Sequence, residues 1–198
     1  MKRHLVMFAI AGLGLLANHA GHAADLAGIA LNQPVTMNEC AERQHDYLPD
    51  DRTTCFKLPT GPSRDPYADA PKPPANGRII VNVSRSDRPG FMSGSDAEVV
   101  LRDGLAASIS VRTHGSNGEA GDFSALKDSF GDASPRHLTV PWNTGGSGPI
   151  QTQTSLQANW ILSGAETVYF SSGEFGAYFG LVRLQTSAAP PHQNGAWD

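Results

Sequence analysis

The sequence lacks most of the patterns on which a functional assignment usually depends. No strand-like segment is followed by Gly-x-x-x-x-Gly-Lys or Gly-x-Gly-x-x-Gly, the frames of the common phosphate-binding loops. Ser93 and Ser147 lie in glycine-rich stretches but lack the Gly-x-Ser-x-Gly frame of a hydrolase nucleophile. The four histidines after residue 23 do not have the i, i+4 or His-x-His spacing of a metal site. The motifs therefore predict no catalytic residue, no metal site and no cofactor.

Charged residues are also scarce, at 17% of the 198 residues. The net charge is −4, and no basic stripe provides the electrostatic footprint of a nucleic-acid-binding protein. The negative sign also disfavours binding to anionic membrane surfaces. With 21 glycines and 14 prolines, the composition is typical of a turn-rich protein that contains more strand than helix.

The first 23 residues have the pattern of a secretory signal peptide. A basic head precedes an uncharged apolar run at residues 5–17, and Gly21 and Ala23 are small residues at positions −3 and −1 of a cut after Ala23. The run is shorter than the roughly 20 residues that span a bilayer, which disfavours the alternative of an uncut anchor. We expect an exported protein, periplasmic or extracellular, with no membrane insertion after cleavage. Residues 24–198 then carry 13 basic and 19 acidic side chains, a formal charge of −6.

The chain contains two cysteines, Cys40 and Cys55, with fourteen residues between them. In an exported protein, an isolated pair of cysteines usually forms one disulfide. A zinc site that includes His45 is the alternative, but the spacing is not that of a zinc knuckle. We predict a Cys40–Cys55 disulfide, which restricts the unfolded chain and contributes roughly 3 kcal/mol to stability.

Composition divides the chain after the signal peptide into four parts. Six prolines fall within residues 59–77, where neither a helix interior nor a central strand can continue, so this part is predicted to be a linker. A second proline-containing stretch near the end of the chain is predicted to be a flexible tail. The predicted parts are a disulfide-clamped N-terminal element (24–58), the proline-rich linker (59–77), the main domain (78–187) and the tail (188–198).

The main domain shows strand patterns joined by short turns. A β-branched run predicts a strand at 78–84. Asp103-Gly104 lies between two strand-like runs and predicts a two-residue hairpin, because Asp and Gly tolerate the positive φ of a type I′ turn. In its second arm, small or polar residues alternate with apolar ones, which predicts one buried and one solvent-facing side. The apolar residues are Leu105, Ala107, Ile109 and Val111. Further strands are predicted at 155–162, 167–171 and 177–186, after a loop at 141–149.

One helix is predicted, at residues 122–130. Asp122 is the expected N-cap, and Gly131 stands at the C′ position. Phe123, Leu126 and Phe130 share one helical face, which we expect to pack on Trp160, Val168, Val182 and Leu184. The order of elements predicts an α+β fold: an antiparallel β-sheet with one short amphipathic helix on one face, plus the N-terminal element. The alternative is an all-β sandwich in which residues 122–130 form only a turn.

Two aromatic residues are hard to bury and are the candidate binding residues: Trp142 in a glycine-rich loop and Phe175 at a turn. We therefore expect a non-enzymatic binding or interaction module of the cell envelope or exterior, with a protein or glycan partner and no nucleic acid. One alternative is a hydrolase with a non-standard site, in which His114 or His137 acts with nearby carboxylates. The other is a periplasmic structural or stress protein without a specific ligand. The oligomeric state is left open.

Overall fold

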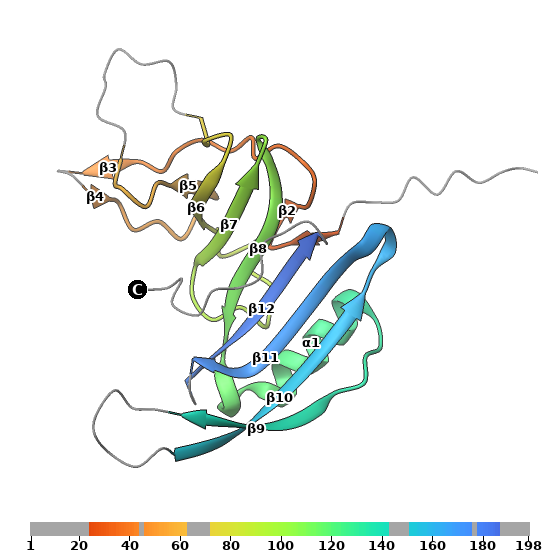
Figure 1. The fold of residues 1–198 in the computed structure, drawn as a ribbon. Helices are drawn as coiled ribbons and strands as arrows, with labels where there is room; N and C mark the ends of the chain where they lie inside the picture. The colour runs from red at the N-terminus through yellow and green to blue at the C-terminus, as the bar shows by residue number, and fades with distance from the viewer. Residues whose placement is uncertain (1–23, 44–45, 63–71, 143–150, 176–177, 187–198) are drawn as a thin grey trace, which may run out of the picture.

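The computed structural model describes residues 24–43, 46–62, 72–142, 151–175 and 178–186. Eight strands form one antiparallel sheet, with the spatial order β5-β6-β7-β8-β12-β11-β10-β9 (Figure 1). Their bounds are β5 (Cys55–Lys57), β6 (Gly77–Asn82), β7 (Asp96–Arg102), β8 (Leu105–Thr113), β9 (Arg136–Trp142), β10 (Gln151–Ile161), β11 (Glu166–Phe175) and β12 (Phe179–Thr186). Two small hairpins pair β1 (Asp25–Leu26) with β2 (Ile29–Ala30) and β3 (Glu42–Arg43) with β4 (Asp46–Tyr47). The helical elements are α1 (Glu119–Phe130) and the 3₁₀ turns η1 (Gly115–Asn117) and η2 (Ser163–Ala165).

A largely antiparallel β protein with one α-helix is therefore confirmed. The all-β alternative required a turn at residues 122–130. The structure has an α-helix at residues 119–130 instead. The described strands outside the large sheet form only the two short hairpins, so they show no second sheet of a sandwich. Within the described ranges, no helix has the length and apolar character needed to cross a membrane.

The sheet consists of two four-stranded halves that meet where β8 pairs with β12. β5 to β8 follow one another in sequence, and so do β9 to β12, with α1 between the two halves. The register at this seam runs from Gly180 opposite Thr113 to Gln185 opposite Ser108. Gly180 has no room for a side chain, because a Cβ there would lie 2.5 Å from the Thr113 Oγ1 and would also meet the Ser171 carbonyl oxygen. The seam therefore brings three strands into close backbone contact.

The predicted hairpin between β7 and β8 is confirmed, with positive φ at Asp103 (50°) and Gly104 (79°). The predicted alternation in β8 is wrong at its start. Val100 pairs with Ser108 but Leu101 pairs with Ala106, so the strand contains one extra residue, a β-bulge. The bulge reverses the faces that follow the turn: Ala106 is fully buried, whereas Leu105 is 37% exposed.

The second face of β8 is also buried, which corrects the prediction of a solvent-facing side. Ser108 and Ser110 are both buried. The Ser110 hydroxyl accepts a hydrogen bond from the Arg183 Nε at 3.1 Å, so a buried partner takes the place of water. Small polar residues in a strand therefore did not mark an exposed face here.

Helix α1 packs on the sheet through the face that the sequence predicted. Phe123 and Phe130 both contact Trp160, with ring centroids 6.0 and 6.3 Å apart, and Leu126 is fully buried. The predicted start was wrong, because the helix begins at Glu119 with Gly118 as N-cap, and Asp122 lies in its first turns. The predicted glycine end is confirmed. Gly131 has φ 88°, and its carbonyl oxygen accepts a hydrogen bond from the Trp160 Nε1 at 2.8 Å.

The Cys40–Cys55 disulfide is confirmed. Cys55 begins β5, and the next residue, Phe56, is fully buried in the core beside Val81. The N-terminal region thereby supplies an outer strand of the large sheet, because β5 pairs with β6. Beyond β5, residues 38–40 continue the pairing: the Phe56 N–H donates to the Asn38 carbonyl and the Cys40 N–H donates to the Phe56 carbonyl.

Strand bounds in the second half differ from the prediction. β9 was not predicted, and it includes Pro141 and Trp142 from the expected loop, whose remaining residues lie outside the described part of the chain. β10 begins four residues earlier than predicted, and β11 continues to Phe175. Most of the predicted linker, at 63–71, the signal segment and the tail also lie outside the described residues.

The seam predicts opposite effects of alanine at two glycines. Gly180→Ala should lower the free energy of unfolding by about 1–3 kcal/mol, because the added methyl group overlaps backbone atoms that cannot move independently. Gly121→Ala is the matched control. A Cβ at Gly121 in α1 meets nothing within 4 Å, and alanine should stabilise the helix by about 0.5–1 kcal/mol. Urea denaturation measures both, and equal stability of the two variants would contradict this account of the seam.

Candidate functional site

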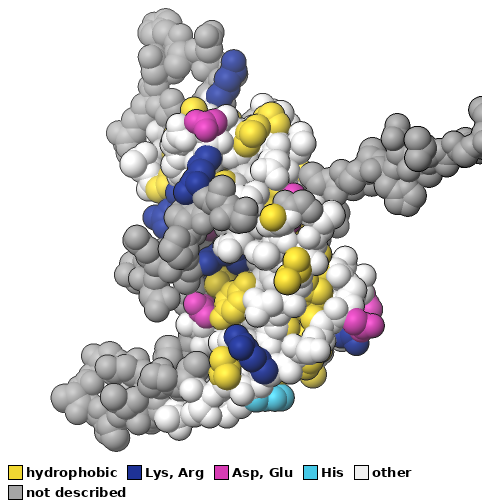
Figure 2. All heavy atoms as spheres, turned by 45° about the vertical axis from the view of Figure 1, so that its right-hand side comes forward, with side chains coloured by type: hydrophobic (Ala, Val, Ile, Leu, Met, Phe, Trp, Pro, Cys, Tyr) yellow, Lys and Arg dark blue, Asp and Glu magenta, His cyan; other side chains and the backbone are white. Residues whose placement is uncertain are grey.

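The candidate site lies at the end of the sheet where β8 leads through η1 into α1, the lower end in Figure 1. The start of β12 lies there too, because Gly180 is paired with Thr113, the last residue of β8. Space-filling Figure 2 shows exposed hydrophobic side chains and a histidine on the lower half of the face in view. The two described histidines, His114 and His137, both contact carboxylates of α1 in this region.

His114 is bound to Asp122 by two hydrogen bonds. Its backbone N–H donates to Oδ2 at 2.8 Å, and its ring Nδ1 lies 2.7 Å from Oδ1. The Asp122 side chain is 3% exposed, whereas that of His114 is 47% exposed. Gly118 allows this arrangement, since a Cβ at that position would overlap the His114 side chain. The sequence did not reveal the pair because the eight-residue separation fits no local pattern and depends on the turn at η1.

The second carboxylate, Glu119, lies one turn before Asp122 on the helix. Its Oε2 accepts a hydrogen bond from the Ser172 hydroxyl at 2.8 Å, and its Oε1 lies 3.9 Å from the His137 Nε2. Ser172 is fully buried and also accepts a hydrogen bond from the Leu156 N–H. An irregularity in the β11–β12 pairing between Ser171 and Phe175 accompanies this placement. Glu119 therefore links α1 to β9, β10 and β11.

The His114–Asp122 pair has the arrangement of a base and its orienting acid. A carboxylate that accepts from Nδ1–H fixes the imidazole ring and leaves Nε2 able to accept a proton. Ser172 cannot act as the nucleophile, because it is buried and committed to Glu119. Chemically, the pair suits activation of a water molecule rather than attack by a serine.

A Ser-x-x-Lys spacing also occurs in α1, at Ser124 and Lys127, but the geometry argues against a catalytic role. The Lys127 ammonium lies 2.7 Å from the Asp132 carboxylate. The hydrogen bond to Asp132 and the charge of that residue raise the pKa of Lys127. A lysine base has to lose its proton near neutral pH, and this partner opposes the loss.

Two exposed aromatic residues lie at the start of β12, and we call them the aromatic turn: Tyr178 and Phe179. Tyr178 is 72% exposed and Phe179 is 40% exposed. The Arg112 guanidinium lies 5.7 Å from the centre of the Phe179 ring, a cation–π contact. The aromatic turn was not among the binding residues predicted from the sequence. Its exposure follows from its position at the very end of the seam.

The two predicted binding residues occupy strand ends. Trp142 is the last residue of β9 and pairs with Gln151, and Phe175 is the last residue of β11 and pairs with Phe179. Their side chains lie outside the described part of the structure, so their binding roles stay predictions. Phe175 is, however, the backbone partner of one member of the aromatic turn.

A row of charged and polar side chains with little exposure crosses the second face of the sheet and is not part of this site. Register places Glu98, Ser110, Arg183 and Tyr169 opposite one another on four successive strands. Glu98 binds Arg78 at 3.2 Å, yet burial raises its pKa, and burial lowers the pKa of Arg183. Partnered charges at strand positions with little exposure are typical of structural networks.

Among the described residues, no group of three or more His, Cys, Asp and Glu side chains is placed to hold a metal ion. Comparisons of the chain with protein-family models, with curated proteins and with solved structures give no match.

Asp122→Ala should lower the free energy of unfolding by about 1–3 kcal/mol, because it leaves the His114 N–H without its partner. Asp128→Ala, an exposed position on the same helix, is the control and should change stability by less than about 0.5 kcal/mol. Chemical denaturation gives both values. A loss at Asp122 no larger than that at Asp128 would show that the pair contributes nothing to holding α1 in place.

Proposed function

We propose that this protein is a non-enzymatic binding module, exported to the periplasm or the exterior, that contacts a protein or glycan partner through the aromatic turn. The observation that carries the proposal is the exposure of two consecutive aromatic residues, Tyr178 and Phe179. Exposed aromatic rings are enriched where proteins bind partners, since they bury a large area and retain few side-chain rotations. We class the fold as α+β, because Leu126 of α1 lies in the core and Phe123, Ala125 and Phe130 pack against it.

The surroundings of the aromatic turn support preorganised binding. Phe179 is held by backbone pairing with Phe175 and by the Arg112 contact, and Gly180 fixes the adjoining backbone in the seam. A ring that is already held in place loses less conformational freedom when it binds, so more of the contact energy remains as affinity. The Arg112 guanidinium adds positive charge beside the Phe179 ring, which suits a partner with both apolar and polar surface.

The proposed location rests on the disulfide and on the N-terminal segment. Disulfides persist in oxidising compartments, and the described part of this chain contains one at Cys40–Cys55. Residues 1–23 have the charge and apolar pattern of a cleaved signal. In this proposal the partner is not a nucleic acid, and cleavage leaves no membrane-inserted segment.

A cross-linked pull-down with the oxidised protein, from the extracellular and periplasmic fractions of its source, tests the proposal. We expect a partner whose recovery falls at least about tenfold in the double variant Tyr178→Ala, Phe179→Ala, a typical size for the loss of an aromatic anchor. Ile161→Ala is the matched control, because Ile161 is an 87% exposed apolar residue away from the aromatic turn. Trp142→Ala and Phe175→Ala test the two residues predicted from the sequence.

Equal recovery by the double variant and the Ile161 variant would show that the aromatic turn is not the contact surface. No enrichment over a scrambled bait, together with an empty glycan array, would contradict the binding function itself.

The second candidate function is hydrolysis, and the His114–Asp122 pair is the observation that favours it. In such a reaction a water proton passes to the His114 Nε2 while the water oxygen attacks an acyl carbonyl carbon. Asp122 stabilises the imidazolium that forms. The bond between the carbonyl carbon and the alkoxy oxygen then breaks, and this leaving oxygen takes the proton from His114, which restores the neutral ring and releases an acid and an alcohol.

For this candidate, a panel of small esters should show turnover that falls by about 10²–10⁴-fold in His114→Gln, the usual contribution of a positioned general base. Asp128→Asn, on the same helix, should leave the rate unchanged. A panel without turnover above buffer, or equal rates for His114→Gln and the unaltered protein, would remove hydrolysis as a candidate.

A further inference from the structure

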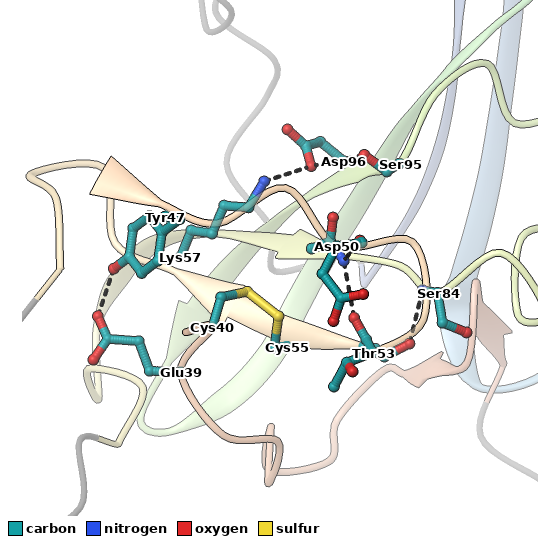
Figure 3. Close-up of a disulfide and its surroundings, with 12 residues drawn as sticks. Glu39, Cys40, Tyr47, Asp50, Thr53, Cys55, Lys57, Ser84, Ser95 and Asp96 are labelled. Atoms are coloured by element: carbon teal, nitrogen blue, oxygen red, sulfur yellow. Dashed lines mark hydrogen bonds and ion pairs between the residues drawn. A yellow bond between two sulfur atoms is a disulfide. The ribbon is translucent and has the colours of Figure 1, made fainter. Parts of the chain in front are cut away.

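A hollow lies beside the disulfide, far from the aromatic turn. Its volume is about 580 Å³, within the range of small-molecule sites. The disulfide forms one wall, and Met37, Leu48 and Pro49 supply further apolar surface. The disulfide is drawn in the middle of Figure 3. In Figure 1, β3, β4 and β5 lie at the upper left, well separated from the start of β12. We call this hollow the disulfide pocket.

The walls of the disulfide pocket are fixed by bonds that do not depend on a ligand. The Asn82 side-chain amide donates to the Asp50 carbonyl at 2.7 Å and to the Thr53 carbonyl at 2.9 Å, which holds the loop on one side. The disulfide ties that loop to Cys40 on the other side. Thr54 donates to the Asp87 carboxylate at 2.9 Å and so fastens the loop to the turn after β6. The pocket is therefore largely formed before binding.

Two acidic residues, Glu39 and Asp50, are among those that line the disulfide pocket, and Figure 3 shows them on either side of the disulfide. None of the described residues that line it is Lys, Arg or His. Asp50 accepts the Arg52 N–H at 2.7 Å, and this bond, followed by that from the Thr53 hydroxyl, lowers the pKa of Asp50. Glu39 accepts the Tyr47 hydroxyl at 2.5 Å. Burial, together with the bond to Glu39, raises the pKa of Tyr47 to about 12, so the phenol is neutral and adds no charge of its own.

These features define the ligand by charge and by shape. An apolar wall with carboxylates at its edge favours a molecule with an apolar body and a positive end. A bare metal ion is not favoured, because the described residues provide no cluster of three ligating side chains. We propose that the disulfide pocket binds a small organic ammonium ion, with its apolar part against Met37, Leu48 and the disulfide and its charge against Asp50.

The proposal is independent of the aromatic turn, since the two surfaces share no residue. The probe is phenethylammonium, with phenylacetate and 2-phenylethanol as anionic and neutral compounds of similar size. Each is titrated into the oxidised, ¹⁵N-labelled protein. We expect phenethylammonium to give saturable shifts at the amides of Leu48, Thr53 and Thr54, with at least tenfold higher affinity than phenylacetate.

Charge-removing variants locate the effect. Asp50→Asn keeps the backbone bonds of the loop and should weaken phenethylammonium binding about tenfold, the scale of a charge-assisted contact, while 2-phenylethanol binds as before. Asp96→Asn is the matched control: this carboxylate is 47% exposed, pairs with Lys57 at 3.1 Å and does not line the pocket. It should leave the affinity unchanged. If Asp50→Asn fails to fold, Glu39→Gln takes its place in the same comparison.

Three results would overturn the proposal: equal affinities for all three compounds, shifts that lie outside the disulfide pocket, or unchanged phenethylammonium binding in Asp50→Asn (in Glu39→Gln, where that variant replaces it). The double variant Tyr178→Ala, Phe179→Ala should bind phenethylammonium like the unaltered protein. Failure of the aromatic turn as a contact surface and failure of this pocket are thus observed separately.

Discussion

The pairing of β8 with β12 is the constraint on which the rest of the structure depends. It joins two sequential sets of four strands into one sheet and leaves space on one face for α1. The pairing requires Gly180, because any larger residue would overlap the backbone of β11 and the Thr113 hydroxyl. Core residues from both halves, including Ile109 and Leu184, face the same side as Trp160 and pack there with the helix. Stability of either half therefore depends on the other.

The same pairing accounts for the contents of the candidate site. His114 follows the last residue of β8, and Phe179 precedes Gly180, the first residue of β12 that pairs with β8, so both lie at one end of the seam. The short turn η1 then directs α1 back across the sheet and brings Asp122 to His114. The disulfide pocket has a different origin. It depends on the loop before β5, which the disulfide closes, and on Asn82 of β6, which holds this loop near the outer edge of the sheet.

Local features of the sequence were predictive where local physics decides the structure. Asp103-Gly104 specified its hairpin, Gly131 specified the helix end, and the cysteine pair specified the disulfide. Features set by distant parts of the chain were missed. β9 was missed although Leu138, Val140 and Trp142 alternate along it, because Pro141 argues against a strand and the pairing with β10 that accommodates it is not visible in the local sequence. Asp122 has the properties of an N-cap, yet its partner is His114 across η1.

The position of β12 at the centre of the sheet has a consequence for how the molecule forms. Leu184 pairs with Ile109, 75 residues earlier in the chain. In the described sheet, β8 lies between β7 and β12, so one of its two edges has no partner until β12 is made. Closing so long a loop costs entropy before the contacts repay it, which slows folding. Because synthesis begins at the N-terminus, the core cannot be completed until β12 has been made. Until the last strand arrives, β8 presents an unpaired edge that another extended chain can occupy.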